Sequence, residues 1–318
     1  MKKSILILVC LFSAIVCNGQ TKDCKKLNLT EHQRKEGASK YNECCIDDVT
    51  IANGVLLKKY NFDSLAKIHC PFGVPVAESK DVVILAAPTY ITGYDSINKI
   101  PLWVSYKLLK RSEIQKGIGR IDCFRYDPRL PLENQASYND YDQPGTDTLQ
   151  RGHLKPSADG YKDKYDNLNT FVMTNMAPQH KTLNMCEWEV LEGFIRDHSQ
   201  VDSVEQAYVI SGSIIDTHSK KLNGKVSIPN GFYKVYYFKA KGKWHYWTYY
   251  LDHDWEMMKF DDYKNYLNSE RKTIDQIEET GKINFFVSGS DGGVIESELD
   301  KTFSLTGLNN YPNWCGTK

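Results

Sequence analysis

The sequence predicts an α+β protein, and three observations support that fold class. Short β-like runs dominate the chain from about Pro71 onward, helical patterns are fewer, and the two do not alternate regularly as they do in parallel α/β folds. With 318 residues, of which 41% are hydrophobic and 25% are charged, the chain has enough apolar residues for a large core. We therefore expect one large domain.

Residues 1–19 are predicted to form a signal peptide. Two lysines provide a basic start, and residues 4–16 form an apolar run shorter than the roughly 20 residues that a membrane span needs. Small residues precede Gln20, so we expect cleavage before Gln20 and a secreted, extracellular protein. Lipidation of Cys17 is the alternative, against which the bulky Val16 argues. No later segment is apolar enough to span a membrane.

Residues 20–70 are predicted to form an N-terminal extension, and residues 71–318 the main domain. Because an exported protein meets an oxidising compartment, disulfides are the expected state of its cysteines, and we expect them to pin the extension to the main domain. Seven cysteines follow the signal peptide: Cys24, Cys44, Cys45, Cys70, Cys123, Cys186 and Cys315. Since seven is odd, at least one is predicted to be free or paired outside the chain.

The elements follow from local patterns along the chain. Two short elements are predicted in the extension, at 49–57 and 63–69. Strands are predicted at 82–87, 102–109, 170–173, 208–210, 225–228, 233–238, 244–251 and 283–287. A polar, aromatic stretch with Pro and Gly predicts a loop at 137–145, and an amphipathic pattern predicts a short helix at 273–280.

The strongest helix pattern spans residues 184–197. Its apolar side chains recur at three- and four-residue spacing. At 3.6 residues per turn, Asn184, Trp188, Glu192 and Arg196 would share one face of this helix. In isolation such a face is also typical of an ordinary capped helix with a Glu–Arg pair.

Gln150-Arg151-Gly152-His153-Leu154 is the first chemically informative motif. Phosphodiester hydrolysis needs an activated water, neutralisation of phosphoryl charge and help for the leaving oxygen. Neutral histidine can accept a proton near pH 7, and arginine is a planar donor matched to phosphate. Because Arg-Gly-His alone arises by chance, His153 becomes informative only in combination with residues 174–192.

The second half of the pattern is Thr174-Asn175-Met176-Ala177-Pro178-Gln179, then Leu183-Asn184, Trp188 and Glu192. In this order and spacing, the residues resemble the core of the DNA/RNA non-specific endonucleases, the ββα-metal nucleases with an Asp-Arg-Gly-His signature. The resemblance extends over roughly residues 70–286. Further matching stretches include Pro101-Leu102-Trp103-Val104-Ser105-Tyr106, Asp127-Pro128-Arg129-Leu130-Pro131, Val209-Ile210-Ser211-Gly212 and Phe232-Tyr233-Lys234.

The resemblance implies a central antiparallel β-sheet flanked by helices, with a ββα-metal (His-Me finger) motif at the site. It also implies one hydrated Mg²⁺, for which Mn²⁺ can substitute, and cleavage of DNA and RNA to 5′-phosphate products. The resemblance implies His153 as general base, Asn184 as direct metal ligand and Glu192 as holder of the metal's waters. It implies Arg151 and Arg196 as phosphate contacts and Arg125 as a substrate-binding arginine. Asn175 and Gln179 would shape and support the catalytic and substrate sides of the site.

One departure from the family pattern keeps other functions open. Gln150 stands where the family has Asp, which removes a negative charge beside the implied metal. Pro71-Phe72-Gly73-Val74-Pro75 and Tyr90-Ile91-Thr92-Gly93-Tyr94 also resemble the catalytically inactive nuclease-like domain of ectonucleotide pyrophosphatase/phosphodiesterases. The alternatives to an enzyme are therefore a catalytically impaired nuclease-like scaffold, a nucleic-acid-binding protein, or an extracellular interaction module.

The charge balance limits any nucleic-acid surface to a local patch. The chain has 40 basic and 40 acidic residues, so its formal net charge is zero. The candidate patch lies within residues 105–129. Its basic residues are Lys107, Lys110, Arg111, Lys116, Arg120, Arg125 and Arg129. A solvated surface of mixed charge is the other interpretation of this segment.

Overall fold

The computed structural model describes residues 46–141, 148–253, 259–269, 271–287, 298–306, 308 and 315. The predicted signal peptide and the first half of the predicted extension, residues 20–45, lie outside the described residues, as does the end of the predicted loop at 137–145. Among the described residues, no helix combines the length and the apolar character needed to cross a membrane.

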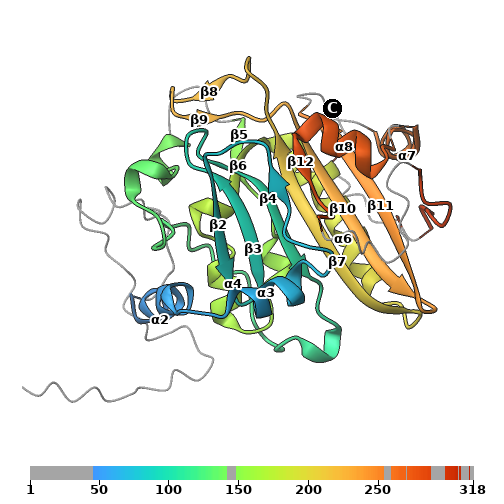
Figure 1. The fold of residues 1–318 in the computed structure, drawn as a ribbon, viewed down its shortest axis with the longest axis horizontal. Coiled ribbons are helices and arrows are strands. Elements are labelled where there is room, and N and C mark those ends of the chain that lie inside the picture. Colours follow the sequence, from blue (N-terminus) through green and yellow to red (C-terminus); the bar gives the residue numbers. More distant parts are fainter. Residues whose placement is uncertain are drawn as a thin grey trace, which may run out of the picture.

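A six-stranded sheet forms the centre of the molecule (Figure 1). Its strand order is β11-β10-β7-β4-β3-β2, and every neighbouring pair is antiparallel. The strands are β2 (Val82–Ala87), β3 (Tyr90–Asp95), β4 (Ile100–Lys107), β7 (Val204–Ile214), β10 (Gly231–Ala240) and β11 (Lys243–Asp252). With its flanking helices, this sheet confirms the α+β fold class and the antiparallel centre.

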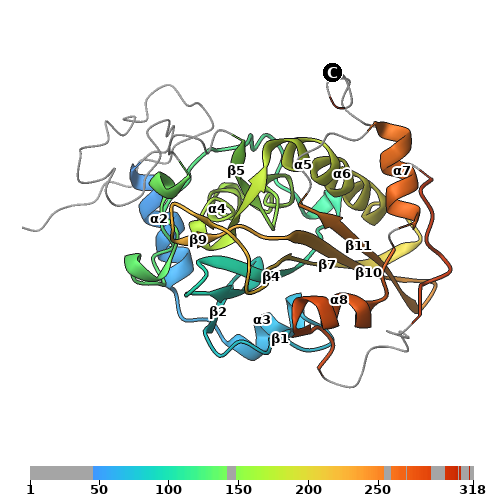
Figure 2. The ribbon, with the colours of Figure 1, turned by 90° about the horizontal axis from the view of Figure 1, so that it is seen from above.

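The remaining elements cover the two faces of the sheet (Figure 2). One face carries α4 (Lys164–Asn169), α5 (Lys181–Met185), α6 (Glu187–Ser199) and the hairpin of β5 (Leu149–His153) and β6 (Met176–His180). The opposite face carries α3 (Phe62–His69), α8 (Ile274–Gly281) and the small sheet of β1 (Val76–Ala77) and β12 (Ile283–Asn284). The other elements are α2 (Ile46–Leu57) beside α4, α7 (Phe260–Ser269), and the pair β8 (Lys221–Leu222) and β9 (Val226–Ser227).

The middle of the sheet is buried on both faces because each face is covered by a layer. Along β10, side chains alternate between the two faces, yet Phe232 to Phe238 are all buried. Tyr233 and Tyr237 contact the phenylalanines that follow α8, whereas Tyr236 packs with Trp247 and His198. Burial of so many aromatic rings makes the sheet a rigid base for the hairpin above it.

Several local predictions were wrong, each for a physical reason. Residues 170–173 form no strand: Val172 makes a single bridge with Arg125, and a 3₁₀ turn follows at once. The predicted strand at 283–287 is paired only at its first two residues. The hairpin β5–β6 was not predicted as strands, because Gln-Arg-Gly-His and Met-Ala-Pro-Gln-His lack the alternation of a half-buried strand.

The predicted helix at 184–197 is two helices. Asn184 belongs to α5, which ends at Met185, and α6 begins at Glu187. Cys186 separates them with a non-helical backbone (φ −116°, ψ −88°) and forms a disulfide with Cys315. The prediction that Asn184 shares a continuous helix face with Glu192 and Arg196 is therefore wrong, although all three still reach the same cleft.

Among the described residues, three cysteines are oxidised and one keeps its thiol. Cys186 and Cys315 are paired, and Cys123 is disulfide-bonded as well. Cys70 is free and buried, as the odd number of cysteines predicted. Burial raises the pKa of the Cys70 thiol to about 12, so this cysteine is a core residue rather than a reactive one.

Candidate active site

The ββα finger is built from β5, β6 and the helices after them. The strands pair in register, with Gly152 opposite Ala177 and His153 opposite Met176. A Cβ on Gly152 would lie 2.2 Å from Oε1 of Gln179 and 2.7 Å from its Cβ, so the glycine makes room for the Gln179 side chain. The Arg-Gly-His motif therefore pairs closely with β6, with the Gln179 side chain in the space beside Gly152.

A cleft of about 640 Å³ opens along the finger. Five of the predicted site residues line it: Arg151, His153, Asn184, Glu192 and Arg196. Gln150 and Glu189 line it as well, and so do Arg120 and Phe124 from the segment before the finger. The structure thus brings together a histidine, a carboxamide, carboxylates and three arginines, which are the groups that phosphodiester chemistry needs.

His153 is kept neutral by its surroundings. It is 8% exposed, and its ring packs edge-on against Phe171 at 4.8 Å between centroids. Burial, followed by the positive charges of Arg120 and Arg151, holds the pKa of His153 well below its usual value. Its Nε2 has no hydrogen-bond partner among the described residues. A neutral imidazole with an uncommitted nitrogen beside a cleft is suited to accept a proton.

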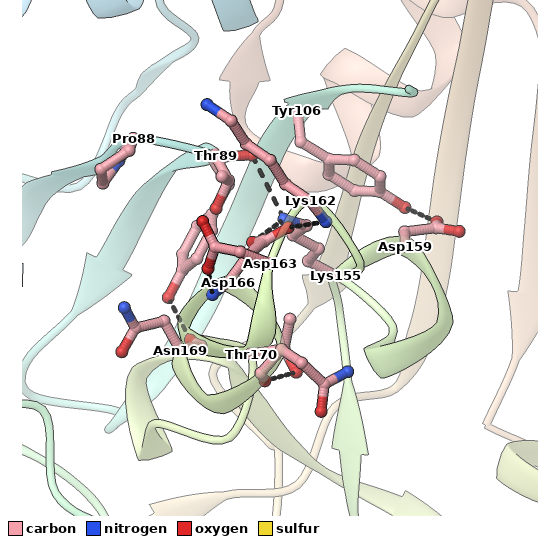
Figure 3. A network of polar contacts seen from close by, with 12 residues as sticks. Pro88, Thr89, Tyr106, Lys155, Asp159, Lys162, Asp163, Asp166, Asn169 and Thr170 are labelled. Carbon is pink, nitrogen blue, oxygen red and sulfur yellow. Dashed lines mark hydrogen bonds and ion pairs between the residues drawn. The ribbon is translucent and has the colours of Figure 1, made fainter. Parts of the chain in front are cut away.

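Buried hydrogen bonds from Asn175 fix the backbone that follows His153. Asn175 is fully buried, and its amide bonds both the N–H and the C=O of Lys155, at 2.9 Å each. Nζ of Lys155 lies 2.8 Å from Oδ1 of Asp166, and both side chains are 2% exposed. Figure 3 shows this ammonium between Asp166 and the C=O of Thr89, at the turn that joins β2 to β3. Asn175 therefore supports the site without lining the cleft.

Asn184 is oriented by Gln150. Nδ2 of Asn184 donates to Oε1 of Gln150 at 2.7 Å, while Nε2 of Gln150 contacts the sulfur of Met185. Asn184 Oδ1 makes no hydrogen bond to another described residue. This carboxamide oxygen and the nearby Glu192 carboxylate are hard oxygen ligands that suit Mg²⁺, which keeps several waters when bound. Among the described residues no group of three or more His, Cys, Asp or Glu is placed to hold a metal ion, and Asn184 and Glu192 are oxygen donors that the cleft offers.

Glu192 is largely enclosed and forms an ion pair that the sequence did not reveal. Nζ of Lys234, on β10, lies 3.4 Å from Oε1 of Glu192 and 3.8 Å from the centre of the Trp188 ring. Burial raises the pKa of Glu192 to about 7 against the opposing effect of Lys234 and Arg196, and burial lowers the pKa of Lys234. Lys234 and Trp188 therefore fix the direction of the Glu192 side chain.

Aromatic rings hold the arginines of the cleft. The Arg151 guanidinium lies 4.2 Å from the centre of the Tyr138 ring and 4.6 Å from that of Phe124. The Arg120 guanidinium lies 5.0 Å from the Phe171 ring centre. Arg120 belongs to the basic patch predicted from the sequence, but its place beside His153 was missed. The only signal in the sequence was its position in that patch.

Two of the predicted substrate-side residues lie elsewhere. Arg125 is 5% exposed and donates to Asn53 of α2, to the C=O of Leu168 and to Asn169. These contacts tie α2 to α4, so the position of Arg125 is that of a structural arginine rather than a substrate-binding one. Gln179 is 1% exposed beneath Gly152, where it can support the hairpin but does not line the cleft.

Comparison with known proteins shows which family the chain matches. Residues 70–291 match the family described as DNA/RNA non-specific endonuclease. A nuclease from Nostoc sp. is 32% identical over 162 residues, which cover 51% of this chain and 56% of that protein. Human mitochondrial endonuclease G is 31% identical over 167 residues, covering 48% and 54%. Zebrafish mitochondrial nuclease EXOG is 29% identical over 186 residues, covering 54% and 51%. The chain thus spans about half the length of these relatives.

Proposed function

Because this chain belongs to the DNA/RNA non-specific endonuclease family, we propose that it hydrolyses DNA and RNA with His153 as general base and Asn184 as metal ligand. One observation supports this most strongly: a neutral, uncommitted imidazole shares a cleft with Asn184, Glu192 and three arginines. Such contacts reach phosphates, which carry no sequence information directly, so cleavage is expected to show little sequence preference.

The residues of the chain divide the chemistry among them. His153 takes a proton from the attacking water and directs it at the phosphorus. Arg151 and Arg196 neutralise the phosphoryl oxygens, and Arg120 extends this positive surface along the cleft. Asn184 would be the direct ligand of a hydrated divalent cation, and Glu192 would hold its waters. When bound, that cation supplies charge stabilisation at the leaving oxygen.

Several finer properties belong to the same proposal. We expect Mg²⁺ to be the working metal, with Mn²⁺ able to replace it, because the donors are oxygen atoms. We expect 5′-phosphate products. We also expect secretion, which the signal-peptide pattern predicts and which the Cys186–Cys315 disulfide supports, since disulfides persist in oxidising compartments.

The test is degradation of plasmid DNA and of total RNA by the purified protein, with Mg²⁺ or with EDTA. Metal-dependent smearing of both substrates, with 5′-phosphate ends on the fragments, is the expected result. Absence of cleavage with every divalent metal would reject the enzyme and favour the nuclease-like scaffold, with Gln150 as the disabling change.

A further inference from the structure

We propose that Asp159 is a positioning residue that aligns the Arg196 guanidinium for phosphate. This inference rests on the proposed function, because it assumes that Arg196 contacts nucleic acid. Asp159 ends the 3₁₀ turn Ser157–Asp159, which comes a few residues after the finger strand β5. Its carboxylate is bound on both oxygens by side chains from two distant elements.

The first contact fixes Arg196. Nε of Arg196 donates to Oδ1 of Asp159 at 2.6 Å, and the side chains are 29% and 5% exposed. This is the one ion pair or hydrogen bond of the Arg196 side chain among the described residues, so its two terminal Nη groups have no described partner, and Arg196 lines the cleft. An arginine held by Nε presents its remaining donors in a fixed plane, which suits two oxygens of one phosphate.

The second contact fixes Asp159 itself. The hydroxyl of Tyr106, on the central strand β4, donates to Oδ2 of Asp159 at 3.1 Å, as Figure 3 shows. Tyr106 is 1% exposed. The bridge Tyr106–Asp159–Arg196 therefore connects the rigid sheet to a helix side chain in the cleft. Because the carboxylate is buried and doubly bonded, it limits the rotamers of Arg196.

A positioning role and a simple charge effect of Asp159 predict opposite changes in nucleic-acid affinity when its carboxylate is removed. Asp159 is negative and lies close to a site for polyanions, so its charge alone opposes binding of nucleic acid. Removing a carboxylate that acts only through charge should tighten binding. Removing one that holds Arg196 in place should weaken binding, by about tenfold for a lost charge-assisted hydrogen bond.

The experiment measures affinity without cleavage. In the His153→Ala background and in EDTA, binding of a fluorescein-labelled DNA duplex is compared for the parent, Asp159→Ala, Arg196→Ala and the double variant. We expect Asp159→Ala and Arg196→Ala to weaken binding to a similar degree, and the double variant to be no weaker than Arg196→Ala. Asp159→Asn, which keeps an acceptor for Nε, should restore most of the affinity. Asp197→Ala, which removes a neighbouring exposed carboxylate, should not weaken binding.

Several results would overturn the proposal. They are an Asp159→Ala variant that binds as tightly as the parent or more tightly, additive losses in the double variant, and equal affinity of Arg196→Ala and the parent. If Asp159→Ala does not fold, Tyr106→Phe decides the matter, since it loosens Asp159 without changing any charge: weaker binding supports the proposal and unchanged binding overturns it. Because the assay needs no turnover, an inactive wild-type protein would reject the proposed function while these affinities still decide the role of Asp159.

Discussion

Nδ2 of Asn184 donates a 2.7 Å hydrogen bond to Oε1 of Gln150, the residue that replaces the aspartate of the family signature. A carboxamide can therefore perform one task expected at this position, which is to bind the nitrogen of Asn184 and leave its Oδ1 without a competing bond to Gln150. It cannot supply the negative charge. Orientation and charge at position 150 are thus separable by substitution.

For Gln150→Asp, we expect tighter metal binding. The carboxylate still accepts from Asn184 and adds a charge, and a unit charge within about 6 Å of a divalent cation in a solvated site contributes on the order of 1 kcal/mol, roughly a fivefold change. The measurement is the Mg²⁺ concentration at half-maximal cleavage, beside direct Mn²⁺ binding. Gln150→Leu, which lacks any acceptor, should weaken both. Equal metal dependence of the two variants would contradict this account.

Arg120→Gln should move the acid limb of the kcat profile to higher pH. The Arg120 charge helps to lower the pKa of His153, so its removal lets the imidazole accept its inactivating proton at a higher pH. In the wild-type protein the His153 imidazole itself should stay neutral below about pH 6, since its pKa lies well below the usual histidine value. Arg111→Gln, at an exposed arginine outside the cleft lining, is the matched control. An unmoved acid limb in Arg120→Gln would disprove the coupling.

Lys234→Met should destabilise the fold by about 3 kcal/mol, because it leaves the Glu192 carboxylate buried without its cation. The additional change Glu192→Leu should recover part of that loss, since no unpaired charge then remains. The free energy of unfolding from urea titrations of the two single variants and the double variant tests this. Strictly additive losses would show that the two side chains are not coupled.

The lowered pKa of buried His69 leads us to expect that the folded protein loses stability in acid. Burial lowers the pKa of His69 from 6.5 to about 4, and its ring accepts from the N–H of Lys107 while also contacting the C=O of Pro88. Since the unfolded chain binds the proton at a higher pH than the folded chain, stability falls as pH drops from the unfolded pKa to the folded one. The loss is about 3 kcal/mol. Urea midpoints measured across this range should show it, and His69→Gln should flatten the slope.

The site residues of the ββα finger were predictable because they lie close together in the sequence. Arg151, His153, Asn184 and Glu192 lie within one stretch of chain whose residue types and spacing are informative, and the cleft unites them as expected. The course of the backbone was less predictable. The break at Cys186 is stabilised by a disulfide to a residue 129 positions away, which no helical periodicity can reveal.

The supporting residues were missed because they come from distant elements. Lys234 on β10 and Tyr106 on β4 lie in stretches that match the family, but their contacts with Glu192 and Asp159 exist only after the sheet has formed, and the local sequence does not reveal them. Arg125 shows the opposite error. It lies in a basic segment beside a matching motif, but the packing of α2 against α4 encloses it. Side-chain direction follows from packing, which a linear pattern does not contain.

The most direct measurement of the central claim is the rate of plasmid cleavage in Mg²⁺ by the wild-type protein, His153→Ala and His218→Ala. His218 is an exposed histidine outside the cleft lining and serves as the matched control. We expect His153→Ala to lose roughly a thousandfold in rate while remaining folded, and His218→Ala to cleave as the wild type does. Cleavage by a folded His153→Ala variant at the wild-type rate would contradict the assignment of His153 as the base.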